Sequence, residues 1–429
     1  MLTLELPNNS SPVKLNLPRI HDRGLSHPEQ FQTYICKGGR KSVQGWLLDG
    51  AATAVVLLSD FQQQLGIEGG MCEIGVHHGL FFITLCLLRS TREKALAIDV
   101  FENQDLNIDN SGCGDFETLI ENIKKHIGCL DRIEILKSDS TQVKPQDILS
   151  KIQREKVRIF SVDGCHTKEH TLKDLKLAQS VLSPGGIIVL DDFYNPWWPG
   201  VDEAAHHLFH SCPELNLKAI GYGDNKLFLT TEDYYETYYQ YMQQVVSKAA
   251  SRWKPVTLWG HQTFAFSLFP PQQLFKRVPY SVGEVVSFKT GGNAQNYQTF
   301  GWYASEKSGT WTHSGDAVIT MNLSSSKGLD WLGKDLHLSV TGIAFLSNDF
   351  LQTSIQVICN EKIVGEWLFA KGDSLKELET SIPVEIIGEN EVIEIVFRSQ
   401  VSLSLKELGV SEDTRQLGFF IKDMRLSVI

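Results

Sequence analysis

Acidic residues stand at intervals along residues 70–192, each within or directly after a short apolar run. They are Glu73, Asp99, Asp139, Asp163, Asp191 and Asp192. Carboxylates can accept hydrogen bonds from hydroxyl groups, pair with cations, or hold a hard divalent ion such as Mg²⁺. Histidines accompany them at His77, His78 and His166, and histidine is the commonest general acid or base near neutral pH. These residues could therefore bind a polar or cationic small molecule and move a proton.

The elements that must position these acids follow from the apolar pattern. Short apolar runs alternate with helical stretches, which predicts five β-α repeats and a parallel sheet covered on both faces. Two further strands are expected around the hairpin signal Gly223-Asp224-Asn225, giving a mostly parallel seven-stranded sheet. The expected parallel strands are 70–75, 94–100, 132–137, 157–162 and 187–190. Ligands of such sheets lie beyond the carboxyl ends of the strands, where the acids stand.

The turn after the first strand reads Glu-Ile-Gly-Val-His-His-Gly over residues 73–79. Gly75 permits a sharp turn, and Gly79 lets the next helix approach a ligand without a Cβ in the way. The turn has neither the G-x-G-x-x-G spacing of dinucleotide folds nor the lysine of a P-loop. Glu73 at the strand end suits an ammonium or sulfonium group. The pattern therefore favours S-adenosylmethionine over NAD or ATP.

The other strand ends fit the remaining parts of that cofactor. Asp99 is placed to accept both ribose hydroxyls. Asp139, followed by Ser140, is expected near the adenine amino group. His77 is expected to contact the cofactor or to position the backbone around it.

The chain length, the net charge and the change in apolar pattern along the chain predict the domain organisation. With 429 residues, two or three domains are expected, and a net charge of −11 argues against a nucleic-acid partner. Residues 1–40 are predicted to be a proline-rich lead-in, 41–250 the α/β domain, 251–282 a linker, and 283–429 an all-β sandwich marked by alternating apolar residues. The oligomeric state is left open, a homo-oligomer included.

The cellular location is also read from the sequence. The first sixteen or so residues lack the pattern of a signal peptide, and no apolar run approaches the roughly 18 residues of a membrane span. The eight cysteines form no CxxC pair, which is typical of a reducing compartment. A cytoplasmic protein is therefore expected.

With these motifs in order, residues 40–245 resemble the class I S-adenosylmethionine-dependent methyltransferases. They are most similar to the subgroup that includes metal-dependent sugar O-methyltransferases of macrolide biosynthesis. The likeness is carried by five stretches, which are Glu73 to Gly79, Ala97 to Phe101, Ser161 to His166, Leu182 to Gly186, and Asp191 to Tyr194. Residues 283–429 resemble, more weakly, β-sandwich modules attached to bacterial sugar-transferring enzymes, which implies a glycan or glycan precursor as the acceptor.

The resemblance implies a metal and a set of catalytic residues. In the metal-dependent members, acids equivalent to Asp163, Asp191 and Asp192 hold a divalent ion, so Mg²⁺ is expected here with these three as ligands. Asp163 and Asp191 would also place the acceptor, and His166 is the candidate general base or a further ligand. The alternative is that Asp163 and Asp192 cap turns and hold the substrate. Cys165 is not typical of the macrolide enzymes, so their substrate does not transfer.

Two other functions are compatible with parts of the pattern. One is a non-catalytic glycan-binding protein whose α/β domain is degenerate, although the intact acids at the strand ends argue against it. The other is an NAD-dependent sugar-modifying enzyme. The leading interpretation is a methyltransferase that acts on an oxygen of a small molecule or glycan.

Overall fold

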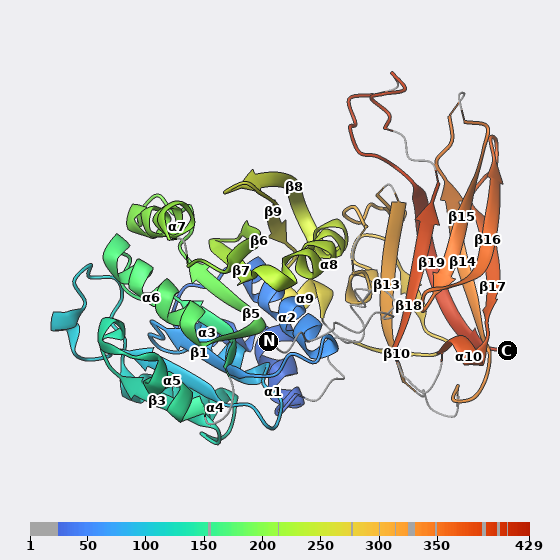
Figure 1. Ribbon diagram of the computed structural model, residues 1–429. Coiled ribbons are helices and arrows are strands. Elements are labelled where there is room, and N and C mark those ends of the chain that lie inside the picture. The colour runs from blue at the N-terminus through green and yellow to red at the C-terminus, as the bar shows by residue number, and fades with distance from the viewer. Residues whose placement is uncertain are drawn as a thin grey trace. The chain divides into compact units, whose positions relative to one another are not determined.

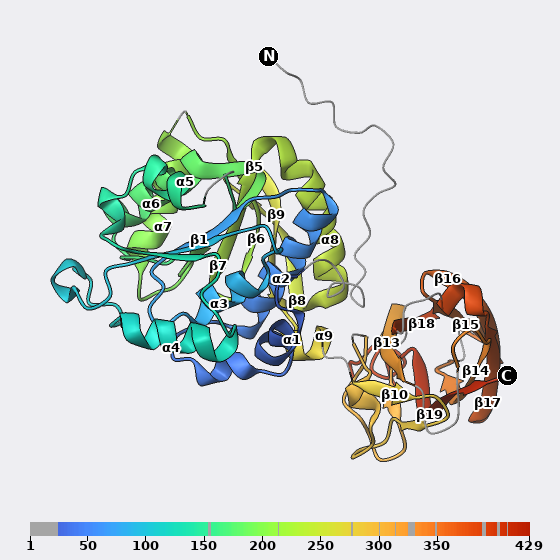
Figure 2. The ribbon, with the colours of Figure 1, turned by 90° about the horizontal axis from the view of Figure 1, so that it is seen from below.

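The computed structural model describes most of the chain in two compact units, Met1–Gln272 and Gln273–Ile429 (Figures 1 and 2). The described residues are 25–152, 156–212, 214–275, 278–299, 301–313, 315–324, 331–347, 350–387, 392–400, 404–409 and 411–429. Most of the lead-in predicted over 1–40 therefore lies outside them. Its described part forms α1 (Pro28–Phe31), η2 (Gln32–Cys36) and the start of η3 (Gly39–Ser42).

A nine-stranded sheet forms the centre of the first unit, in the order β3-β2-β1-β4-β5-β7-β6-β9-β8. Strands β1 to β5 pair in parallel, and β7 lies antiparallel between β5 and β6. The predicted α/β fold class is confirmed. The strands are β1 (Gly70–Ile74), β2 (Ala95–Asp99), β3 (Ile133–Lys137), β4 (Val157–Val162), β5 (Leu182–Asp191), β6 (Leu217–Gly223), β7 (Lys226–Thr231), β8 (Ala250–Leu258) and β9 (His261–Leu268).

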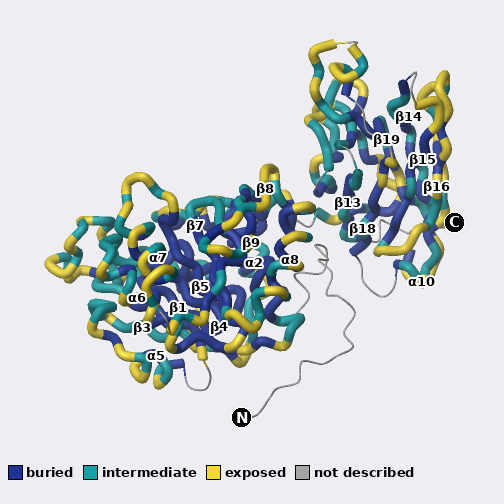
Figure 3. The backbone as a smooth tube through the Cα atoms, turned by 45° about the horizontal axis from the view of Figure 1, so that its top comes forward, coloured by how far each residue is buried: buried dark blue, intermediate teal, exposed yellow. Residues whose placement is uncertain are grey.

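Helices cover both faces of this sheet, with α5, α6 and α7 on one face and α2 and α8 on the other (Figure 2). Strands β1 and β4 are buried throughout, because helices lie above and below them (Figure 3). The helices are α2 (Asp49–Gln64), α3 (Leu80–Leu87), η4 (Gln104–Leu106), α4 (Phe116–His126), η5 (Ser140–Gln142), α5 (Pro145–Ile152), α6 (Lys168–Val181), α7 (Pro199–Ser211), η6 (Glu232–Tyr234), α8 (Tyr235–Ala249) and α9 (Pro271–Leu274). No helix in the described part of the chain is both long enough and apolar enough to cross a membrane.

Residues 251–268, assigned to a linker from the sequence, instead complete the edge of the sheet as β8 and β9. Strand β9 buries Phe264 and Phe266, whereas most of β8 is exposed. Pro255 lies within β8, although proline cannot donate to a β ladder. It is tolerated here because β8 is an edge strand.

The second unit contains two sheets, in the orders β10-β13-β18-β15-β16 and β11-β19-β14-β17, with β12 paired to β19. Their apolar faces share one core, which includes Trp331, Trp367, Phe397 and Phe419. The predicted β-sandwich is confirmed. Its elements are β10 (Pro279–Ser281), β11 (Val285–Ser287), η7 (Ala294–Asn296), β12 (Thr310–Trp311), β13 (Gly315–Ser324), β14 (Leu336–Ala344), β15 (Gln352–Cys359), β16 (Lys362–Ala370), β17 (Lys376–Ile382), α10 (Val384–Ile387), β18 (Val392–Ser399) and β19 (Phe419–Val428).

Candidate active site

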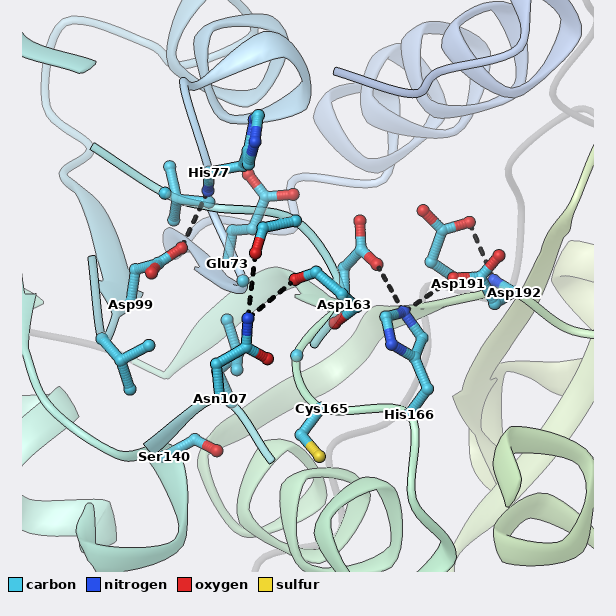
Figure 4. Close-up of a pocket in the computed structure, with 18 of the residues that line it drawn as sticks. Glu73, His77, Asp99, Asn107, Ser140, Asp163, Cys165, His166, Asp191 and Asp192 are labelled. Carbon is cyan, nitrogen blue, oxygen red and sulfur yellow. Dashed lines mark hydrogen bonds and ion pairs between the residues drawn. The ribbon is translucent and has the colours of Figure 1, made fainter. Parts of the chain in front are cut away.

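A cavity of about 670 Å³ opens at the carboxyl ends of the parallel strands. It lies at the switch point of the sheet, where the chain runs from β1 to β2 on one side and returns to β4 on the other. The predicted acids at the ends of β1, β2, β4 and β5, and after β3, all line it. Figure 4 shows most of these side chains facing the same space.

The glycine turn after β1 brings two strand ends into backbone contact. Gly75 has a φ of +82°, and a Cβ at this position would lie 1.6 Å from the carbonyl oxygen of Asp163. The Gly75 N–H donates to the Ile98 oxygen at 2.9 Å, and the Asp163 N–H donates to the Ile74 oxygen at 3.0 Å. Only glycine allows so close an approach, so the turn fixes Asp163 against β1.

Glu73 supplies a buried carboxylate at the floor of the cavity. Only 1% of the residue is exposed, and Oε1 accepts a hydrogen bond from Ser161 Oγ at 3.3 Å. Oε2 has no partner among the described residues. Burial, and secondly the nearby Asp163, raise the pKa of Glu73 well above its ordinary value. A cationic group bound in the cavity would satisfy this oxygen, which fits a sulfonium or ammonium ligand.

Asp99, at the end of β2, fixes the backbone on the side of the cavity where the cofactor is predicted to bind. Its Oδ2 accepts the backbone N–H of His77 at 2.8 Å, and its Oδ1 accepts that of Phe101 at 2.7 Å. Both donor residues have positive φ angles, 52° and 48°. The carboxylate thus fixes two strained turns, and its remaining lone pairs are those that could accept ribose hydroxyls.

Asp139 and Ser140, the two residues after β3 predicted to lie near the adenine, have different surroundings. Asp139 caps η5, because its carboxylate accepts the backbone N–H of Thr141 at 2.8 Å and the Thr141 hydroxyl at 2.9 Å. Ser140 lines the same end of the cavity and lies apart from the acidic group around Asp163 (Figure 4). The hydroxyl of Ser140 is therefore as well placed for a ligand as the carboxylate of Asp139.

His166 stands at the centre of the acidic end of the cavity. Its Nε2 lies 2.8 Å from Asp192 Oδ2 and 3.8 Å from Asp163 Oδ1, and its Nδ1 lies 2.9 Å from Asp109 Oδ2 (Figure 4). The ring stacks on Trp198 with centroids 4.3 Å apart. Burial alone would lower the pKa of His166, but the hydrogen bonds with Asp109, Asp163 and Asp192 raise it to about 12. The ring is therefore a cation held among acids.

Asp109 is a site residue that the sequence did not reveal. It lies in the loop between β2 and α4, far from any strand end, and its Oδ2 also accepts the backbone N–H of His166 at 2.6 Å. Its Oδ1 accepts the hydroxyl of Ser111 at 2.7 Å. Burial opposes ionisation, but the hydrogen bonds from His166 and Ser111 lower the pKa of Asp109. The feature of the sequence that could have pointed to Asp109 is the polar segment around Ser111, which contains acidic residues but has no periodic apolar pattern.

Asp191 does not join the metal-type cluster in this structure, although it was predicted to be a ligand. Lys226 lies directly opposite it in the β5–β7 ladder, with Nζ 2.6 Å from Asp191 Oδ2. The other oxygen, Oδ1, accepts the backbone N–H of Asp192 at 2.9 Å and the amide of Asn225 at 3.2 Å. Both oxygens are thus engaged by the protein itself.

The described residues that come together as a potential metal site are Asp163, His166 and Asp192, whose ligand atoms lie within 4.8 Å of one another. Two carboxylates suit Mg²⁺ or a similar hard ion, whereas the imidazole suits softer ones. The set fits a divalent ion once His166 gives up its Nε2 proton, because a protonated ring cannot act as a ligand.

Residues 72–193 match a family model described as a methyltransferase domain. The matched segment spans β1 to the end of β5 and contains every predicted cofactor and metal residue. The chain is an S-adenosylmethionine-dependent methyltransferase. The geometry of Glu73 and the glycine turn given above fits that cofactor, and the assignment of the individual cofactor residues stays a prediction.

Three solved O-methyltransferase structures are similar to part of this methyltransferase at low identity. The O-methyltransferase NovP is 14% identical over 42% of this chain and 78% of its own, with a TM-score of 0.35. CalS11, a TDP-rhamnose 3′-O-methyltransferase, is 18% identical over 43% and 81%, with a TM-score of 0.32. An O-methyltransferase from Bacillus cereus, in complex with SAH, is 15% identical over 49% and 93%, with a TM-score of 0.33. Likenesses of this size say nothing about the acceptor. A search of the curated proteins finds no match.

Proposed function

We propose that this methyltransferase acts on an oxygen, and that the acceptor is a hydroxyl of a sugar or glycan precursor. One observation carries the oxygen assignment. The acids and His166 at the ends of β4 and β5 form a polar group beside Glu73, whose Oε2 has no hydrogen-bond partner among the described residues. A hydroxyl placed there meets both a hydrogen-bond acceptor and a fixed positive charge.

We propose that the cofactor lies between Glu73, the glycine turn and Asp99, with Ser140 and Asp139 at its adenine end. His77 and Gly79 frame the turn that carries it. When bound, S-adenosylmethionine supplies an electrophilic methyl group. Its positive charge would be stabilised by Glu73 Oε2, which has no hydrogen-bond partner among the described residues. This arrangement leaves the end of the cavity around His166 for the acceptor.

Asp163 is better suited to accept the proton than His166, the general base expected from the sequence. Burial, and secondly the nearby Asp191, raise the pKa of Asp163 well above its ordinary value. His166 already faces carboxylate oxygens with both ring nitrogens, which a doubly protonated ring satisfies. We therefore assign Asp163 to take the hydroxyl proton, and His166 to hold the negative charge that develops on the acceptor oxygen.

A divalent ion is a further component of the proposal. Asp163, Asp192 and a neutral His166 would hold it, with Mg²⁺ favoured by the two carboxylates. When bound, the ion would supply positive charge that lowers the pKa of the acceptor hydroxyl. The positive charge beside the acceptor hydroxyl would then come either from the protonated ring of His166 or from the ion.

Calorimetric titration with S-adenosylmethionine tests the cofactor assignment. The expected result is binding that weakens at least tenfold in Glu73→Ala, with no binding of NAD. Absent binding of S-adenosylmethionine would favour the non-catalytic alternative, and binding of NAD instead would favour the oxidoreductase. Release of S-adenosylhomocysteine in the presence of sugar acceptors tests methyl transfer. Methyl transfer that is unchanged by EDTA would show that no metal ion is required.

A further inference from the structure

We propose that the acceptor carries no phosphate and is an uncharged or amino-bearing sugar whose ring rests on Trp197. This inference rests on the proposed function, because it concerns the acceptor end of the same cavity. It separates free sugars and glycosides from sugar nucleotides, which carry a pyrophosphate next to the ring.

The charge of the cavity wall is the first argument. None of the described residues that line the cavity is Lys or Arg. Its carboxylates are those of Glu73, Asp99, Asp139, Asp163, Asp191 and Asp192. Proteins bind phosphate with arginine, lysine or the N–H groups of helix N-termini, and carboxylates repel it. The lining therefore favours a neutral or positively charged acceptor.

The two basic side chains at the acceptor end, Lys226 and His166, are already paired with carboxylates of the protein. Lys226 is 2% exposed, lies 2.6 Å from Asp191, and sits over the Phe81 ring at 4.6 Å from its centroid. His166 is enclosed between Asp109 and Asp192. Carboxylates balance both groups, so this end of the cavity carries no excess positive charge for a phosphate.

The start of α7, in the loop that follows the acids after β5, does not supply an anion site either. Helix α7 begins at Pro199, which has no N–H, and carries Asp202 in its first turn. The Asp202 carboxylate accepts the backbone N–H of Tyr194 at 2.8 Å. The end of the helix that would attract a phosphate is therefore already complemented by an acid.

Trp197 supplies the surface for the sugar ring. It lines the cavity although 80% of it is exposed. Asn195 ties it to the acidic group, because its amide donates to Asp192 Oδ1 at 2.5 Å and its oxygen accepts the Trp197 N–H at 3.1 Å. The electron-rich face of an indole attracts the polarised C–H groups of a sugar and, more strongly, an ammonium group.

Paired acceptors test the charge argument. Glucose, glucosamine and rhamnose are supplied as methyl glycosides and as nucleoside diphosphate sugars, with and without Mg²⁺, and release of S-adenosylhomocysteine is measured. The expected kcat/KM is at least tenfold higher for one or more of the glycosides than for its nucleotide-linked partner. The inference is overturned if a nucleotide-linked sugar is the better substrate. It is also overturned if the protein binds S-adenosylmethionine but methylates none of the glycosides. If the protein does not bind S-adenosylmethionine, the proposed function itself is refuted.

A pair of tryptophan variants tests the platform. Trp197→Ala should raise the acceptor KM at least tenfold and leave the affinity for S-adenosylmethionine within twofold. Trp253→Ala removes another exposed tryptophan, 41% exposed on β8 and outside the cavity lining, and should change neither value. Equal effects of the two variants on the acceptor KM would overturn the role of Trp197.

Discussion

Replacing Gly75 by alanine should damage the cofactor site more than any generic glycine replacement. The new Cβ would lie 1.6 Å from the Asp163 oxygen, whereas real Cβ contacts are essentially never shorter than 3.0 Å. The ends of β1 and β4 must therefore move apart. The positive φ costs about 1–2 kcal/mol for a residue with a Cβ. Weakening the two backbone hydrogen bonds at this junction adds about 1–3 kcal/mol.

Gly66 provides a matched control. It has a φ of +70°, close to the +82° of Gly75, but a Cβ there would meet no atom within 4 Å. Gly66→Ala should therefore cost only the backbone term of about 1–2 kcal/mol. The clash and the displacement of Asp163 are confined to Gly75→Ala.

Two measurements separate the variants. Denaturant unfolding of the first unit should show a clearly larger loss for Gly75→Ala than for Gly66→Ala. Calorimetry should show at least a tenfold loss of S-adenosylmethionine affinity, about 1.4 kcal/mol, for Gly75→Ala alone. Equal losses of stability and unchanged affinity in both variants would refute the view that the turn at Gly75 fixes Asp163 and the cofactor floor.

Three further substitutions probe the buried charges. Glu93→Gln breaks a buried bidentate pair with Arg158, at 2.6 and 3.1 Å, and should lower the unfolding free energy by about 3–5 kcal/mol in denaturant titrations. Burial raises the pKa of Asp174 to about 7, so the unfolding free energy should fall as pH rises from about 4 to 7, and Asp174→Asn should abolish that fall. Asp109→Asn should lower kcat at least tenfold through the loss of charge at His166, with the affinity for S-adenosylmethionine within twofold. An unchanged kcat would show that Asp109 serves the loop alone.

The strand-end residues could be predicted because their position follows from the β-α repeat itself. Once residues 70–190 are assigned to parallel strands, Glu73, Asp99 and Asp163 must meet at one edge of the sheet. The roles of Asp109 and Lys226 could not be predicted in this way. Asp109 reaches the site from a loop without periodicity, and Lys226 reaches it through the β5–β7 register, which pairs it with Asp191.

The same limit applies to the predicted metal ligands after β5. Asp191 and Asp192 are adjacent in sequence, and both were predicted to be ligands. Asp192 has a φ of +58°, and its carboxylate faces His166, whereas that of Asp191 faces Lys226. Backbone conformation and a cross-strand neighbour decided this, and neither is visible in a linear pattern.

The partners of the acids indicate why the cavity suits a cationic cofactor. Asp191 is paired with Lys226, and Asp192 shares His166 with Asp109. Glu73 Oε2 has no partner among the described residues, and Asp163 has only the more distant contact to His166, at 3.8 Å. Burial and mutual repulsion disfavour the charges of these two carboxylates, so a positive group bound between them would relieve both effects. The protein thus pairs Asp191 and Asp192 with its own basic side chains and leaves Glu73 and Asp163 for the ligands.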